Sequence, residues 1–174
     1  TYARSGQYAE NVYWDKASGL LDQMACAVGG MISIDFEDPS KPIVEKIDFD
    51  FAKQGYNLVI VNTGKSHADL NADYSSVPTE MKSVAKALGH DVCRRITVAD
   101  IEKDLPSLRE KVGDRAVLRA LHFLAENKRV EEQIQALKNG DFDAFLRIVT
   151  ASGNSSWKWL QNCYSPANYR EQGI

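Results

Sequence analysis

Asp22 is the side chain in this sequence best placed to do acid–base chemistry. It follows Gly19 and precedes the apolar residues 24–28, so we expect it in the first turn of a short, buried helix. The backbone N–H groups left unpaired at the start of a helix stabilise an ionised acid. Two roles fit this position. The carboxylate either caps its own helix, or it faces a cleft and accepts a proton from a substrate.

A second group of polar side chains follows the most apolar run of the chain. Residues 56–62 predict a central strand that is buried on both faces. The loop after it carries His67 and Asp69 and leads to Tyr74. A tyrosine hydroxyl can donate and accept hydrogen bonds while its ring packs on apolar surface. The alternative is an exposed loop whose polar side chains contact only water.

Four short segments carry recognisable motifs. They are residues 19–23 (GLLDQ), 61–74 (VNTGKSHADLNADY), 119–127 (RALHFLAEN) and 136–142 (ALKNGDF). In this order they resemble the galactokinases, which are sugar kinases of the GHMP superfamily. Together the segments reach over most of the chain, which makes the resemblance more specific than any one motif would be.

The resemblance implies roles for the residues above. Asp22 would accept the proton of the anomeric hydroxyl, or align that hydroxyl, while ATP supplies the phosphoryl group with Mg²⁺. Tyr74 matches the tyrosine that binds the sugar, and His67 and Asp69 are further candidates for substrate binding. The likeness is weakest at residues 157–165, so the implied substrate is galactose or a related hexose. The cap remains the alternative role for Asp22.

The motif that cradles ATP in this family is not found in the sequence. The family uses a Gly- and Ser-rich loop, because phosphate binding needs backbone N–H groups from glycine-rich turns. Gly29-Gly30 is too short to replace that loop. We therefore assign no ATP-binding residues and no metal ligands, and we expect the chain alone to bind ATP weakly and to be inactive. Its first and last residues suggest a piece of a longer enzyme that uses ATP and Mg²⁺.

The pattern of elements predicts an α+β fold, with strands in the first third and mainly helices afterwards. The resemblance implies a fragment of the two-lobed GHMP-kinase fold. Residues 1–55 would form the rear of the N-terminal lobe, with the catalytic-base motif, and residues 56–174 the front of the C-terminal lobe. The expected strands are residues 31–36, 44–51 and 56–62, and the expected helices are residues 7–14, 20–28, 77–88, 100–105, 107–112, 114–139, 141–151 and 155–162.

Composition and charge narrow the range of partners. The net charge is −3 and the Lys and Arg residues are scattered, which argues against a nucleic-acid surface. No run reaches the roughly 18 apolar residues that cross a membrane. Three widely spaced cysteines fit reduced thiols in the cytoplasm. The predicted ligand is a small-molecule hexose, and unpaired edges of strands 31–36 and 56–62 favour self-association of the chain.

Two other functions remain open on the sequence alone. The first is a non-catalytic sugar-binding sensor or regulator with the same fold. The second disregards the resemblance and takes residues 114–162 as a helical module that binds a protein partner. Within that segment we expect His122 to be a core or interhelical hydrogen-bonding histidine. Trp157, Trp159 and Tyr164 either pack the last helix or form a platform on which a sugar stacks.

Overall fold

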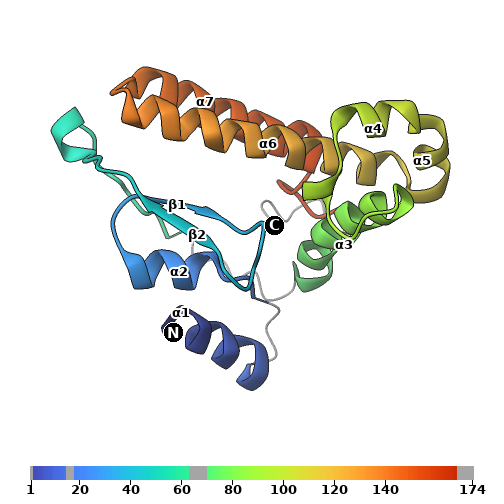
Figure 1. Ribbon diagram of the computed structural model, residues 1–174, viewed down its shortest axis with the longest axis horizontal. Coiled ribbons are helices and arrows are strands. Elements are labelled where there is room, and N and C mark those ends of the chain that lie inside the picture. Colours follow the sequence, from blue (N-terminus) through green and yellow to red (C-terminus); the bar gives the residue numbers. More distant parts are fainter. Residues whose placement is uncertain (1, 15–17, 63–69, 168–174) are drawn as a thin grey trace. The chain divides into compact units, whose positions relative to one another are not determined.

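The computed structural model describes residues 2–14, 18–62 and 70–167, the side chain of Asn71 excepted. The chain forms two compact units, which we call unit 1 (Thr1–Tyr56) and unit 2 (Asn57–Ile174), and each is described by itself. The described residues combine a small antiparallel sheet early in the chain with many helices later (Figure 1). The predicted α+β class is therefore confirmed.

The described residues of unit 1 form helical segments, a two-stranded sheet and, near the end of the unit, a short 3-10 helix, η2 (Ala52–Gln54) (Figure 1). Helix α1 (Tyr2–Tyr8) continues into a π-helical turn, η1 (Ala9–Tyr13), and α1 contacts α2 (Leu21–Val28). Strands β1 (Ile32–Asp35) and β2 (Ile43–Lys46) pair antiparallel. The predicted end of the second helix is confirmed. Gly29 and Gly30 have φ angles of 70° and 73°, and Gly29 donates its N–H to the Ala25 carbonyl at 2.9 Å.

The second predicted strand is shorter than its alternating pattern suggested. We expected residues 44–51, but β2 stops at Lys46. Only the N–H of Ile47 continues the ladder, by donating to the Met31 carbonyl at 2.9 Å. Beyond that point β1 offers no further residues for pairing, and alternation alone does not supply a neighbouring strand.

The strand predicted at residues 56–62 is wrong. Residues 57–62 form no strand, and the side chains of Leu58, Val59, Ile60 and Val61 are 73–90% exposed. A strand needs a neighbour for its backbone hydrogen bonds. In the described part of the chain the two strands, β1 and β2, pair with each other, so no third strand completes a sheet with this apolar segment.

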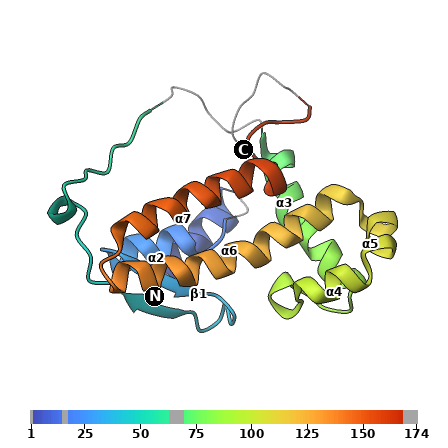
Figure 2. The same cartoon turned by 90° about the horizontal axis from the view of Figure 1, so that it is seen from above.

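The described part of unit 2 is mainly helical, and Tyr164 beyond the last helix is in an isolated β-bridge. Figure 2 shows α6 and α7 side by side, with α3, α4 and α5 toward the other end of α6, in agreement with the contacts between α3 and α6 and between α6 and α7. These elements are α3 (Asn71–Ala87), α4 (Val98–Lys103), α5 (Leu105–Val112), α6 (Asp114–Lys138), α7 (Phe142–Ser155) and a π-helical turn, η5 (Ser156–Leu160).

The core of unit 2 lies where α3 to α6 meet. The predicted inward position of Val117 is confirmed, whereas Val130, also expected inward, is 41% exposed. Burial raises the pKa of the Cys93 thiol in this core to about 11, so the thiol stays protonated at neutral pH. The fully or nearly fully buried apolar residues of this core are Val84, Ala85, Cys93, Ile96, Ile101, Leu108, Ala116, Val117 and Ala120.

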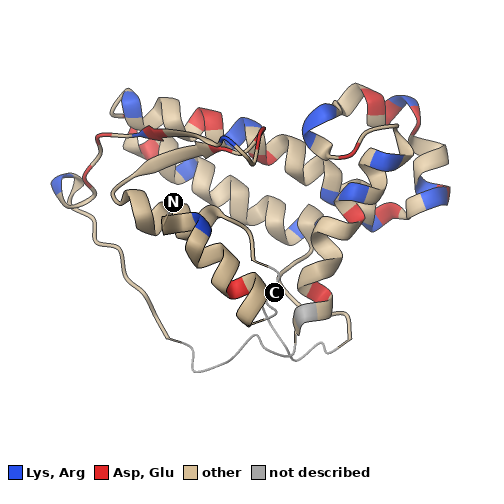
Figure 3. Ribbon diagram, turned by 60° about the horizontal axis from the view of Figure 1, so that its bottom comes forward, with Lys and Arg blue, Asp and Glu red and all other residues tan. Residues whose placement is uncertain are grey.

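The charged side chains on unit 2 are of mixed sign. Figure 3 shows Lys and Arg interspersed with Asp and Glu on α4 and α5, rather than one sign gathered on a single face. Among the described helices, none combines the length and the apolar character that crossing a membrane requires.

Candidate functional site

Asp22 lies in the first turn of α2 and its side chain is exposed. The N-cap residue is Leu20, which makes no side-chain capping hydrogen bond. Within the described residues, Asp22 has no hydrogen bond or ion pair either, so the structure gives no support to a capping role. The prediction of a buried helix is wrong. No residue of α2 is buried, because unit 1 packs little apolar surface against it.

A polar cluster fixes the backbone just before Asp22. The N–H of Ser18 donates to Asn11 Oδ1 at 2.8 Å, and the Ser18 hydroxyl donates to the Glu10 carboxylate. Gln23 Nε2 donates to the same Glu10 carboxylate, Oε2, at 3.1 Å. These contacts join η1 to the residues before and after Asp22, so they fix the start of the helix that carries it. Sequence reasoning missed Ser18 and Glu10, because each is an ordinary surface residue type.

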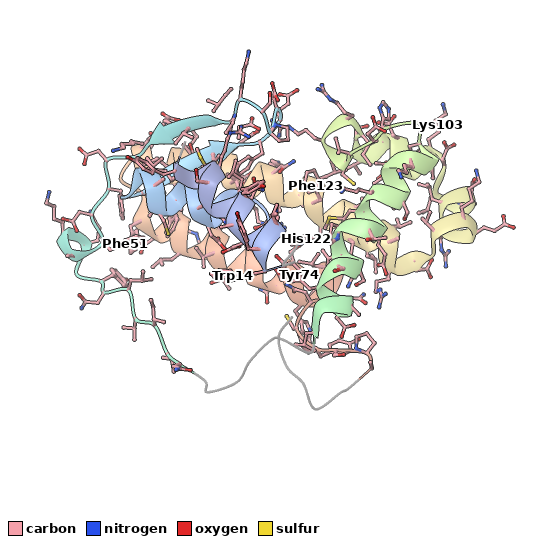
Figure 4. The ribbon with its side chains drawn as sticks, turned by 90° about the horizontal axis from the view of Figure 1, so that it is seen from below. Trp14, Phe51, Tyr74, Lys103, His122 and Phe123 are labelled. Atoms are coloured by element: carbon pink, nitrogen blue, oxygen red, sulfur yellow. The ribbon has the colours of Figure 1, made fainter. Side chains whose placement is uncertain are left out.

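Tyr74 lies in the first turn of α3 (Figure 4), whereas we expected it in a loop. The helix starts at Asn71, several residues before the first residue of the apolar pattern that predicted it. The sequence pattern did not predict this early start, because the first two turns are mainly polar. The Tyr74 side chain is 62% exposed. His67 and Asp69 lie outside the described residues, and so do their predicted contacts.

Asp22 and Tyr74 belong to different units, Asp22 to unit 1 and Tyr74 to unit 2. What the two share is an exposed side chain on the first turn of a helix.

The helix that carries Tyr74 is anchored by a buried cation that sequence reasoning did not single out. Arg119 Nη1, on α6, donates to Ser76 Oγ at 2.9 Å and to Glu80 Oε2 at 3.0 Å. Arg115, one turn earlier on α6, also pairs with Glu80. The signal for Arg119 was present in the sequence. It falls on the same face of the long helix as Ala116 and Ala120, which makes it a cation at an inward position.

Several known proteins that are similar to this chain share one name. The chain is 33% identical to a galactokinase from Streptomyces coelicolor over 159 residues, which cover 88% of this chain and 39% of that protein. It is 31% identical to a galactokinase from Thermotoga neapolitana over 137 residues, or 79% of this chain and 36% of the relative. A galactokinase from Haemophilus influenzae is 27% identical over 159 residues, with 88% and 39% covered. No family model matches the chain.

The chain is a homologue of the galactokinases. This confirms the resemblance drawn from the motifs, and galactokinases are GHMP kinases. The chain spans about two fifths of the length of the curated relatives that it matches.

The glycine pair of this galactokinase-like chain does not fit a triphosphate. Gly29 and Gly30 follow a helix instead of preceding one, and the N–H of Gly29 is already bonded to the Ala25 carbonyl. A phosphate cradle needs several N–H groups that point at the ligand. Among the described residues, no group of three or more His, Cys, Asp or Glu side chains could hold a metal ion.

His122 in this galactokinase-like chain is an interhelical histidine, as predicted. It is buried in the middle of α6 (Figure 4), and its Nδ1 lies 2.9 Å from Ser155 Oγ on α7. One turn later, Glu126 accepts a hydrogen bond from Ser152 of α7 and pairs with Arg129. These contacts hold α6 against α7 and leave His122 with a structural role.

Burial of His122 predicts a dependence of stability on pH. Desolvation lowers its pKa from the ordinary value, against a smaller opposing effect of Glu126. The unfolded chain then binds the proton more readily, so stability is full above about pH 6.5 and is lost as the pH falls toward the folded pKa. We expect the urea midpoint of the chain to drop between pH 7 and pH 5, and His122→Gln to reduce that drop. A midpoint with the same pH dependence in both proteins would contradict this assignment.

Two of the terminal aromatic residues, Trp157 and Tyr164, lie next to each other. The rings of Trp157 and Tyr164 have centroids 6.3 Å apart, and η5 contacts both α6 and α7. Trp157 and Trp159 nevertheless remain exposed. The packing contacts are those expected of a last helix, and a stacking platform for a sugar stays a hypothesis.

Proposed function

We propose that the complete protein carrying this chain is an ATP-dependent kinase that phosphorylates the anomeric hydroxyl of galactose or a related hexose. The observation that carries the proposal is the match to galactokinases over 88% of the chain. The carboxylate of Asp22, which is exposed in the first turn of α2 and has no partner among the described residues, supports it. In this proposal residues 1–55 belong to the N-terminal lobe and residues 56–174 to the C-terminal lobe, and the protein works in the cytoplasm.

In this reaction Asp22 is the base. Its carboxylate takes the proton of the anomeric hydroxyl, or aligns that hydroxyl, as the oxygen bonds to the γ-phosphorus of ATP and the bond from that phosphorus to the departing ADP breaks. The carboxylate lies in the first turn of α2, the end of a helix at which the helix dipole favours a negative charge. Because no neighbouring side chain of the described residues occupies it, the carboxylate needs no rearrangement before it meets the sugar. In the complete protein ATP would be the phosphoryl donor and Mg²⁺ would neutralise its charge, and no residue of this chain is assigned to hold either group.

Tyr74 binds the sugar in this proposal, and His67 and Asp69 are further substrate contacts. The exposed phenol of Tyr74 can exchange hydrogen bonds with a sugar hydroxyl. Pro78, four residues later in α3, has no N–H to donate to the Tyr74 carbonyl, so this part of the helix lacks one backbone hydrogen bond.

The test is phosphoryl transfer by the complete protein with ATP, magnesium and a panel of hexoses. We expect a 1-phosphate to form fastest from galactose or from a sugar closely related to it. Sugar binding without any transfer would instead favour the sensor or regulator. Neither binding nor transfer with any hexose would contradict the proposal.

We also propose that residues 1–174 alone self-associate through the apolar segment 58–61, because exposed β-prone residues recruit strands from other chains. Light scattering over a range of concentrations should show a mass above that of one chain. Val59→Lys should shift the chain toward the monomer, since charge on an edge blocks pairing. Val130→Lys, at an exposed valine on α6, is the matched control and should leave the mass unchanged. A monomeric wild-type chain, or equal effects of the two variants, would contradict this proposal.

A further inference from the structure

We propose that Arg119 is a positioning residue for the sugar site, which it serves by fixing the first turns of α3 and so the direction of Tyr74. The proposal rests on the proposed role of Tyr74. Arg119 itself touches neither sugar nor ATP in this account. It acts through the backbone that carries the phenol.

The contacts of Arg119 reach α3, the helix that carries Tyr74, and the end of η5. Its side chain is almost fully buried, and Nη1 is shared between Ser76 Oγ and Glu80 Oε2 at 2.9 and 3.0 Å. Its Nε donates to the Leu160 carbonyl at 2.9 Å. One guanidinium thus joins the first half of α3 to the end of η5. Burial lowers the pKa of Arg119 while the charge of Glu80 raises it, and an arginine remains charged under both influences.

The chain beyond η5 then returns to the residue next to Tyr74. Gln161 follows Leu160 in a left-handed conformation, with φ 56° and ψ 50°, and its N–H donates to the Ser156 carbonyl at 2.8 Å. This sharp turn leads to Ser165, which is 1% exposed. The Ser165 hydroxyl donates to Asp73 Oδ2. Asp73 and Ser76 are therefore both held from outside α3, on either side of Tyr74.

The first turns of α3 need such support because they are intrinsically weak. The N-cap Leu70 makes no side-chain capping hydrogen bond, and Pro78 removes the N–H that would bond to the Tyr74 carbonyl. Among the described residues, no hydrogen bond or ring contact holds the Tyr74 phenol. Its position therefore depends on the backbone beneath it, which Arg119 and Ser165 restrain.

The geometry requires arginine rather than any cation. The planar guanidinium presents donors in fixed directions, so Nη1 can reach Ser76 and Glu80 while Nε reaches Leu160. A lysine ammonium carries three donors on one atom and cannot span both elements at once. Arg119→Lys keeps the charge near Glu80 but loses the link between the two elements.

The test is a double-mutant cycle on galactose binding by the complete protein, measured by calorimetry. Arg119→Lys and Ser165→Ala should each weaken binding roughly five- to tenfold in the wild-type background. In a Tyr74→Phe background, which lacks the phenol that the network directs, each should weaken binding less than about twofold. Arg109→Lys, at an exposed arginine of α5, is the control and should have no effect in either background.

The outcomes separate this inference from the proposed function. Equal fold-changes in both backgrounds would overturn positioning and leave Arg119 as a stabilising residue only. A Tyr74→Phe variant that binds galactose normally would overturn it too, while Asp22 and the kinase activity stand. Galactose binding without phosphoryl transfer would instead refute the kinase proposal, and the same cycle would still decide the role of Arg119. Ser165→Ala keeps the test valid if Arg119→Lys fails to fold.

Discussion

Asp22→Asn in the complete protein is expected to lower kcat about 10²- to 10⁴-fold and to leave the galactose dissociation constant nearly unchanged. Asparagine has the size of aspartate but cannot accept the proton of the anomeric hydroxyl. Because Asp22 is exposed and has no partner among the described residues, the substitution removes no contact that supports the fold. Steady-state kinetics and calorimetric galactose binding on the same preparation test both halves of the expectation.

The matched control for this variant is Asp48→Asn. Asp48 is another exposed acid of unit 1, outside the site, and its replacement should leave both kcat and binding unaltered. Near-wild-type turnover in Asp22→Asn would remove Asp22 from the role of base. A parallel loss of galactose binding and turnover would show that the residue acts in binding or folding, and would count equally against the base.

Glu80→Gln is expected to destabilise the chain by about 3 kcal/mol. Removal of one partner from a buried ion pair leaves the other charge uncompensated, and here Arg119 is almost fully buried. The expected loss of unfolding free energy is at the lower end of the range for buried ion pairs, because the Glu80 side chain is 22% exposed to solvent. Arg115, which also binds Glu80, adds a second cation that would lose its partner. Urea unfolding followed by the helical circular dichroism signal measures the change.

Asp114→Asn provides the control for the ion pair. Asp114 pairs with Arg109 in comparable geometry, at 2.6 Å, but both side chains are more than half exposed. Exposed pairs contribute little because water and salt screen them. We expect no resolvable change in stability. If Glu80→Gln and Asp114→Asn behaved alike, burial of the Arg119 pair would not be what stabilises this region.

The features that could be predicted from the sequence are those set by local rules. Gly29 ends α2 because a positive φ suits glycine, and Gly140, in the short turn after α6, also adopts a positive φ. The interhelical role of His122 followed from its place among apolar residues at helical spacing. The motifs at residues 19–23, 61–74, 119–127 and 136–142 together indicated the family, since the order of several short motifs is specific even where each one is weak.

The features that could not be predicted depend on partners distant in the chain. Arg119 bonds to Ser76 across 43 positions, and Ser165 bonds to Asp73 across 92 positions. No local pattern specifies such pairs. The strand expected at residues 56–62 failed for a related reason, because its apolar composition describes a buried environment that the described chain does not provide. The extended start of α3 was missed since its first turns are polar.

The measurement that tests this account most directly is a crystal structure of the complete protein with galactose bound. We predict that the Asp22 carboxylate lies within hydrogen-bond distance of the anomeric oxygen, and that the Tyr74 hydroxyl contacts another hydroxyl of the same sugar. A structure in which galactose meets only one of these side chains, or neither, would contradict the account.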